Sequence, residues 1–489
     1  MDFTFSLATY LVLVVTVLYI LSNWKRKALN NFPPGPKGWP LVGNVFSIDL
    51  KKPQRTYIEL SKKYGPVFSV QMGRKKMVIL VGYETVKDAL VTHAEEFGGR
   101  ASIPVNKNLE KGLGKFLSIT VYCLYCKASR KLAKQKYWSN MRTTEYGPRS
   151  GQSEDQSNQW IVVLFPGKPF DNSTILSTSV ANIIAPILFG HRMEYEDPVF
   201  LRLVNLNSEY VKLLGSPMVT VIFADIVPLS VPHETTRDVH FKGYFIPKEA
   251  KHPETKSYFH NENLKCNIIL QEAKHPETKS YFHNENLVRL VRNVFSAGVE
   301  TTSTALRWAL LLMIKYPDIQ EKVHDEISRV IGSAHPTYSH RTQMPFTNAV
   351  IHEILRFADI VPLNVPHETT RDVHFKGYFI PKGTYIIPLL SSVLKDKTQF
   401  DAPEEFNPNH FLDSEGNFLK KEAFMPFSAG RRACPGEILA RMELFIFFTS
   451  LLQKFSFRPP PGVTNINLSS DVGFTSVPLE GMICAIPRA

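Results

Sequence analysis

The stretch from Phe427 to Gly436 constrains this chain more than any other, because it places one cysteine in a loop rich in glycine and arginine. It reads Phe-Ser-Ala-Gly-Arg-Arg-Ala-Cys-Pro-Gly. Gly430 and Gly436 let the backbone turn tightly and approach a flat group without a Cβ in the way. The arginines favour the thiolate form of Cys434. A lone cysteine is more often a small buried apolar residue, but this loop predicts an anionic sulfur ligand to iron.

The same ten residues resemble the haem-ligand signature of the cytochrome P-450 family, Phe-x-x-Gly-x-Arg-x-Cys-x-Gly, at all five fixed positions. The resemblance covers roughly residues 28 to 115, 166 to 219 and 272 to 489. It implies a mainly α fold with small β-sheets that binds haem b, with the Cys434 thiolate as the axial ligand and metal-binding residue. The cofactor-binding residues implied by the resemblance are Arg100, Gly298, His367, Phe427 and Arg432, of which Arg100, His367 and Arg432 would pair with the propionates.

Length and composition allow one large globular unit or two or three average domains, and they exclude a disordered chain. The chain has 489 residues, 44% of them hydrophobic, which is enough to fill a sizeable core. A formal charge of +12 favours contact with anionic lipid or with an acidic protein, and no nucleic-acid-binding motif accompanies it. Five scattered cysteines argue against a disulfide framework.

The N-terminus predicts a membrane anchor followed by a spacer. Residues Phe3 to Leu21 are apolar and uncharged, and at about 1.5 Å per residue a helix of this length crosses a bilayer core. Asp2 precedes the apolar run and the basic stretch Trp24 to Lys27 follows it, so an uncleaved anchor at 1–27 is favoured over a signal peptide, with the rest of the chain in the cytosol. Prolines and glycines predict an extended spacer at 28–45, and the catalytic domain is expected at 46–489.

Periodicity predicts a β-hairpin and a series of helices. Apolar residues alternate from Val67 to Val81 around Gly73-Arg74-Lys75, as in a hairpin. Helical patterns cover Tyr83 to His93, Ser177 to Phe189, Pro198 to Leu214, Val288 to Lys315, Pro317 to Ile331 and Phe346 to Phe357.

Two parts of the chain are atypical. Residues 223–248 and 357–382 are the same segment apart from Ser230 against Asn364, and 249–264 recurs unchanged at 272–287. The second copies fall where the family pattern expects them, and the extra copies occupy the place of helices that would roof a substrate pocket. Residues 220–271 are therefore expected to be atypical and poorly ordered: only the copy that contains His367 should lie near the cofactor, and the first copy should have no strand partner. Residues 115–166 include a long polar run from Arg142 and are also expected to be atypical and poorly ordered.

A run of small and polar residues interrupts an apolar helix from Ala297 to Thr302. A glycine within a helix costs about 1 kcal/mol of stability relative to alanine, so the presence of Gly298 needs a structural or functional explanation. One reason is close helix packing. The other, which the resemblance supports, is a groove for dioxygen in which Glu300 and Thr301 act as catalytic residues that hold water and pass protons.

A second charged motif predicts a structural role. Glu353 and Arg356 lie three residues apart on one helical face. The resemblance implies a buried pair that is completed from Phe406-Asn-Pro-Asn-His410-Phe411, where His410 replaces the family's arginine. If the pair were exposed instead, it would contribute little to stability.

Together these features predict a haem-thiolate monooxygenase that inserts one atom of dioxygen into apolar substrates such as fatty acids or foreign compounds. The chain has no dinucleotide fingerprint, so electrons would come from an NADPH-dependent reductase, with cytochrome b5 as a further donor. The predicted location is the endoplasmic reticulum membrane. Two alternatives remain at this point: a catalytically silent membrane-anchored haem protein, and a haem-thiolate isomerase that needs no reductant.

Overall fold

A computed structural model describes residues 31–40, 42–73, 75–101, 167–215, 239–241, 244–246, 284–479 and 481–488. The predicted membrane helix and the atypical segment 115–166 lie outside these residues. His233, the counterpart of His367 in the extra copy, also lies outside them. No helix within the described ranges is both long enough and apolar enough to cross a membrane.

The predicted mainly α architecture with small sheets is confirmed for the described residues. Its α-helices are α2 (Pro53–Tyr64), α3 (Tyr83–Lys87), α8 (Ser173–Phe189), α9 (Pro198–Leu214), α13 (Asn284–Lys315), α14 (Pro317–Val330), α15 (Pro345–Ala358), α16 (Leu390–Leu394) and α17 (Glu437–Lys454). Shorter helical turns are η1 (Val45–Ser47), the π-helical turn η2 (Asp88–Thr92), η4 (Tyr338–Gln343), η5 (Pro408–Phe411) and η6 (Gly430–Arg432).

The strands form one mixed sheet and several small antiparallel ones. The five-stranded sheet has the order β1 (Val67–Met72), β2 (Lys75–Leu80), β10 (Tyr385–Pro388), β7 (His367–Glu368) and β3 (Gly99–Arg100). Only β2 and β10 run parallel within it. The other pairings join β11 (Phe455–Arg458), β14 (Met482–Pro487) and β4 (Phe170–Asp171); β12 (Ser470–Val472) and β13 (Ser476–Pro478); β5 (Val239–Phe241) and β6 (Tyr244–Ile246); and β8 (Val373–Phe375) and β9 (Tyr378–Ile380).

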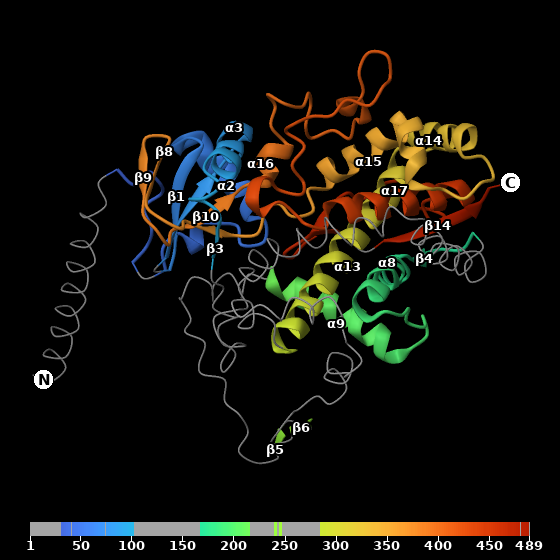
Figure 1. The fold of residues 1–489 in the computed structure, drawn as a ribbon, viewed down its shortest axis with the longest axis horizontal. Coiled ribbons are helices and arrows are strands. Elements are labelled where there is room, and N and C mark those ends of the chain that lie inside the picture. The colour runs from blue at the N-terminus through green and yellow to red at the C-terminus, as the bar shows by residue number, and fades with distance from the viewer. Residues whose placement is uncertain are drawn as a thin grey trace, which may run out of the picture.

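Helix α13 is the axis of the helical part of the fold. It crosses the molecule between α8 and α9 on one side and α15 and α17 on the other, and it packs against all four (Figure 1). One large apolar cluster joins these helices, with Val299, Leu312 and Phe445 among its fully buried side chains. Two smaller clusters surround the five-stranded sheet. The sheet and the helical part therefore have separate cores, which meet near the ligand loop.

Local sequence explains several element boundaries. Pro198 at the first turn of α9 needs no hydrogen-bond acceptor, and the Asp197 side chain accepts the N–H of Val199.

The predicted β1–β2 hairpin is confirmed, with Val67 opposite Leu80. The described part of the predicted spacer packs against this hairpin, since Ser69 donates its N–H to Pro34 O at 2.7 Å.

The helix predicted from Tyr83 to His93 changes its winding halfway. α3 ends at Lys87, and η2 continues as a wider turn. Turns of this kind inside helices are rare and often accompany functional sites. Here η2 presents the carbonyl of Leu90 to Gly430 of the ligand loop.

The extra copy of the duplicated segment forms the same hairpin as its counterpart. β5 pairs with β6 in the register in which β8 pairs with β9. In the second copy the turn residues Lys376 and Gly377 both have positive φ, which is the two-residue turn that matches strand twist. The expectation that the first copy has no strand partner is therefore wrong, because its partner lies within the copy itself. β5–β6 does not join the main sheet (Figure 1).

Candidate functional site

The ligand loop holds Cys434 at its end, immediately before α17. The N–H of Cys434 donates to the carbonyl oxygen of Phe427 at 2.8 Å, which closes the loop. The Cys434 side chain is exposed and forms no disulfide. A Cβ on Gly436 would lie 3.9 Å from Cys434 Sγ, so the glycine leaves the space beside the sulfur free of a side chain. The loop thus presents an accessible thiol, as an iron ligand requires.

Gly430 fixes the loop against η2. Its φ is +68°, and a Cβ at this position would lie 1.8 Å from the carbonyl oxygen of Leu90. Any other residue would have to push two backbones apart. The glycine of the signature therefore serves the packing of the loop rather than its flexibility alone.

His367 provides a buried nitrogen with no partner among the described residues. The side chain is only 1% exposed, and its Nδ1 lies 2.7 Å from the carbonyl oxygen of Phe97. Nε2 is buried and has no hydrogen-bond partner there. Burial, with the positive charges of Arg100 and Arg432 beside it, lowers the pKa of His367 to about 3. The ring is therefore neutral, and the positive charges of the two arginines beside it would attract an anion.

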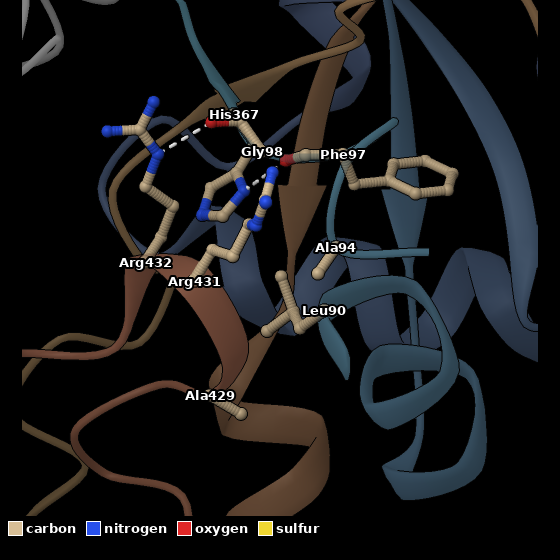
Figure 2. A pocket seen from close by; sticks show the side chains of 8 residues that line it. All are labelled: Leu90, Ala94, Phe97, Gly98, His367, Ala429, Arg431 and Arg432. Atoms are coloured by element: carbon tan, nitrogen blue, oxygen red, sulfur yellow. Dashed lines mark hydrogen bonds between the residues drawn. The ribbon is translucent and has the colours of Figure 1, made fainter. Parts of the chain in front are cut away.

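Two arginines surround this histidine. β3 and β7 pair with Arg100 directly opposite His367. The guanidinium of Arg100 donates to Val365 O at 3.0 Å, and Arg432 donates its Nε–H to Gly98 O at 2.6 Å. Arg431 lies at the same hollow, but its guanidinium pairs with Glu95 at 3.1 Å. Figure 2 shows His367, Arg431 and Arg432 around this hollow.

The structure therefore brings together the residues that the sequence analysis assigned to the propionates, Arg100, His367 and Arg432. Two fixed cations and a buried unsatisfied imidazole nitrogen suit carboxylate groups, and an exposed thiol lies on the same loop as Arg432. These groups fit a haem, which carries two propionates and an iron. No cluster of three or more His, Cys, Asp or Glu side chains suited to a metal occurs in the described part of the chain.

Glu300 and Thr301 are neighbours in α13, but they contact different groups. Thr301 is half-buried and donates its hydroxyl to Ala297 O at 2.8 Å. Glu300 is buried, and its Oε2 accepts the hydroxyl of Ser208 in α9 at 3.0 Å. Burial raises the pKa of Glu300, while the hydrogen bond from Ser208 opposes the rise. The structure shows no direct contact between the acid and the alcohol of the predicted relay.

Gly298 packs against another helix. A Cβ at this position would lie 2.4 Å from Ile184 Cδ1 in α8. The close-packing explanation of this glycine is thus supported by the geometry. A role in making room for dioxygen stays a prediction.

The predicted Glu353–Arg356 pair is buried and fully formed. Arg356 donates Nε–H and Nη2–H to the two Glu353 oxygens, each at 2.7 Å, and neither side chain is exposed. The Nδ1 of His410 lies 3.2 Å from both oxygens. Histidine therefore takes the third place, as expected from the sequence. Arg356 also donates to the carbonyl oxygens of Leu394 and Pro403, so the group connects α15 to the segment before the ligand loop.

Sequence reasoning missed Arg441 and its partners in α15 and α17. The guanidinium carbon of Arg441 lies 5.2 Å from the ring centre of Phe427, and Nη1 lies 2.7 Å from His352 Nε2. Glu437 accepts from Arg441 at 2.9 Å. The i, i+4 spacing of Glu437 and Arg441 was the available signal, but such pairs are common on helix surfaces. Here Arg441 packs on the ring of Phe427, whose carbonyl oxygen accepts the N–H of Cys434.

Comparisons with known proteins agree with this site. A family model described as "Cytochrome P450" matches residues 33–485. "Cytochrome P450 2K1" of Oncorhynchus mykiss is 43% identical over 515 aligned residues, which cover 98% of this chain and 96% of that protein. "Cytochrome P450 2C11" of Rattus norvegicus is 40% identical, with 98% and 97% covered.

Proposed function

Since the chain belongs to the cytochrome P-450 family and is a monooxygenase of that family, we propose that it inserts one oxygen atom into apolar substrates with electrons from an NADPH-dependent reductase. The observation that carries the proposal is that the loop with the exposed Cys434 thiol also places Arg432 beside His367 and Arg100. Bound haem supplies the activation of dioxygen and the transfer of one of its atoms.

The chain's own residues hold this cofactor at its two ends. Cys434 serves as the thiolate ligand, and Phe427, braced by Arg441, fixes the loop behind it. Arg100, Arg432 and His367 hold the propionates. A propionate beside His367 would give Nε2–H an acceptor and would favour the imidazolium, which burial alone disfavours. The haem is of the b type in this proposal, in keeping with the cytochrome P450 family.

Thr301 and Glu300 of α13 would hold water and move protons during the reaction. Thr301 has its hydroxyl on the half-buried face of α13, where it can order water beside the reacting oxygen. Burial raises the pKa of Glu300 above its ordinary value, which makes the carboxyl a better proton acceptor than an exposed glutamate. The apolar side chains of Ala297, Val361, Leu363 and Phe474 would line the substrate space in this proposal.

The membrane and its proteins are the proposed setting. The apolar run at the N-terminus would anchor the chain in the endoplasmic reticulum membrane, with the catalytic domain cytosolic. The reductase, and cytochrome b5 as a second donor, would approach the basic surface around Cys434.

Turnover with a reconstituted reductase tests the proposal. We expect product from a fatty acid such as lauric acid only when NADPH, reductase and dioxygen are all present. Thr301→Ala should keep haem and lose most of the product per NADPH oxidised, with more peroxide released, because water is no longer ordered. Peroxide rearrangement without reductant would favour the isomerase. A protein that loads haem and consumes no NADPH with any apolar substrate would favour the silent form.

A further inference from the structure

The carboxyl group of Glu300 lies at the meeting point of three elements. It projects from α13, accepts the hydroxyl of Ser208 from α9, and is also bonded by the hydroxyl of Thr475 from the turn between β12 and β13. Glu300 and Thr475 are buried. The acid next to Thr301 is therefore held by side chains distant in the sequence rather than by its own helix.

The same elements contact one another on both sides of this group. The backbone of Gly215, at the end of α9, packs so closely on Gly473 that a Cβ on Gly215 would lie 1.8 Å from its carbonyl carbon. Lys212 Nζ and Asp471 form an ion pair at 3.6 Å. The Nε1–H of Trp308, two turns after Glu300 in α13, donates to Ser476 O at 2.7 Å. These contacts fix α9, α13 and the β12–β13 hairpin relative to one another.

We propose that Ser208 is a positioning residue for Glu300: its hydroxyl fixes the rotamer of the acid adjacent to Thr301 and couples the docking of α9 to the protonation of that acid. The inference rests on the monooxygenase function proposed above. It adds a residue from α9 that controls how readily the acid gives up its proton. A hydroxyl that donates to a carboxylate stabilises the charged form, so Ser208 offsets part of the effect of burial.

The charged surroundings of Glu300 single out Ser208. Among the described residues, Arg307 of the same helix and Lys212 of α9 act on the Glu300 carboxyl through their charge, and Ser208 opposes its burial more than either. Helix α8, which also packs on α13, has no charged side chain. The buried acid of α17, Glu443, faces Thr302 instead. Three other ionisable groups of helices near α13 have partners of their own: Glu326 with Phe346 N, Glu353 with Arg356, and His352 with Arg441.

Infrared titration of the ferric protein tests this inference directly. The carbonyl stretch of protonated Glu300 is identified as the band that disappears in Glu300→Gln, and its intensity is followed against pH. In Ser208→Ala we expect the midpoint to move to higher pH, equivalent to an increase in proton affinity of about threefold or more, because the bond to the charged form is lost. Ser208→Thr keeps the hydroxyl and should restore the wild-type midpoint.

Two controls separate positioning from general damage. Asn205→Ala changes an exposed residue of the same helix and should leave the Glu300 midpoint unchanged. Amide hydrogen exchange of residues 208–215 should be faster in Ser208→Ala than in Asn205→Ala, because α9 loses an anchor to α13. An unchanged midpoint in a folded Ser208→Ala protein would overturn the proposal, and so would equal exchange in the two variants.

The outcome can be read independently of the proposed function. The carbon monoxide spectrum of the reduced wild-type protein is recorded on the same preparation. Absence of a thiolate-type spectrum would refute the haem-thiolate assignment, whereas the infrared midpoints and the exchange rates would still decide the role of Ser208. A normal spectrum with an unchanged midpoint would refute the role of Ser208 alone.

Discussion

Arg356 and Glu353 form a bidentate ion pair with two 2.7 Å hydrogen bonds and no exposed surface on either side chain. An uncompensated charge would remain buried if either partner were removed. The pair lies on α15, and Arg356 also binds the carbonyl oxygens of Leu394 and Pro403 in the segment that leads to the ligand loop. Its loss should therefore disturb the loop as well.

Breaking this pair should therefore be costly. We expect Glu353→Gln to lower the free energy of unfolding by about 3–5 kcal/mol and to weaken haem retention. Chemical denaturation measures the first effect. Glu59 and Lys62 provide a matched control, since they have the same spacing and lie 2.8 Å apart, but both are 67% exposed. Glu59→Gln should cost less than about 0.5 kcal/mol. Equal costs at the two sites would contradict a structural role for the buried pair.

Gly298 should respond to its neighbour in α8. We expect Gly298→Ala to lower the melting temperature despite the better helix propensity of alanine, because its Cβ would lie 2.4 Å from Ile184 Cδ1. Ile184→Val removes that atom, so the double variant should recover more stability than the two single effects predict. A Gly298→Ala protein as stable as wild type would show that packing does not explain this glycine.

Glu443 should make stability fall as pH rises. The side chain is 4% exposed on α17, and burial, only partly offset by a hydrogen bond with Thr302, raises its pKa to about 8. The folded protein thus retains a proton that the unfolded chain has released between about pH 4.5 and 8, so the free energy of unfolding decreases across this window. Glu443→Gln removes that decrease.

The comparison is made by denaturation at both ends of the window. The free energy of unfolding of Glu443→Gln, taken relative to that of wild type, should increase by at least about 2 kcal/mol from about pH 5 to pH 8.5. Glu209→Gln, at an exposed position of α9, is the control and should show no such gain. A difference between Glu443→Gln and wild type that does not change with pH would refute a neutral buried acid.

His367 should matter for cofactor binding, whereas His374 seven residues later should not. His374 is exposed in β8 and belongs to the same duplicated segment. We expect His367→Ala to weaken haem affinity at least about tenfold, since a propionate would lose one charge-assisted hydrogen bond in a buried hollow. Haem transfer to apomyoglobin measures the affinity. Equal transfer rates for His367→Ala and His374→Ala would contradict the propionate assignment.

The ligand loop and the buried pair could be predicted because their chemistry is concentrated in short motifs. The signature around Cys434 and the Glu353–Arg356 spacing each combine several residue types at fixed distances. The β1–β2 hairpin could be predicted for a similar reason, because alternation around Gly73-Arg74-Lys75 is a local signal. The hairpins β5–β6 and β8–β9 were not predicted, although the same sequence with a Lys-Gly turn forms both.

Features that depend on long-range packing could not be predicted in this way. Helix α17 was missed because its buried run from Glu443 to Leu452 has no polar face, and without an amphipathic period a helix leaves little signal. The contact of Gly298 with Ile184, and that of Ser208 with Glu300, join residues far apart in the sequence. Only the packing of α13 against α8 and α9 brings them together.

The carbon monoxide difference spectrum of the reduced protein, compared between wild type and Cys434→Ser, tests the central claim most directly. Wild type should give the long-wavelength Soret band of a thiolate-ligated haem. In Cys434→Ser that band should be absent, because serine offers no sulfur, whereas Cys484→Ser, a change at a buried cysteine, should retain it. Persistence of the thiolate band in Cys434→Ser would show that another residue binds the iron, and the assignment of the site would be wrong.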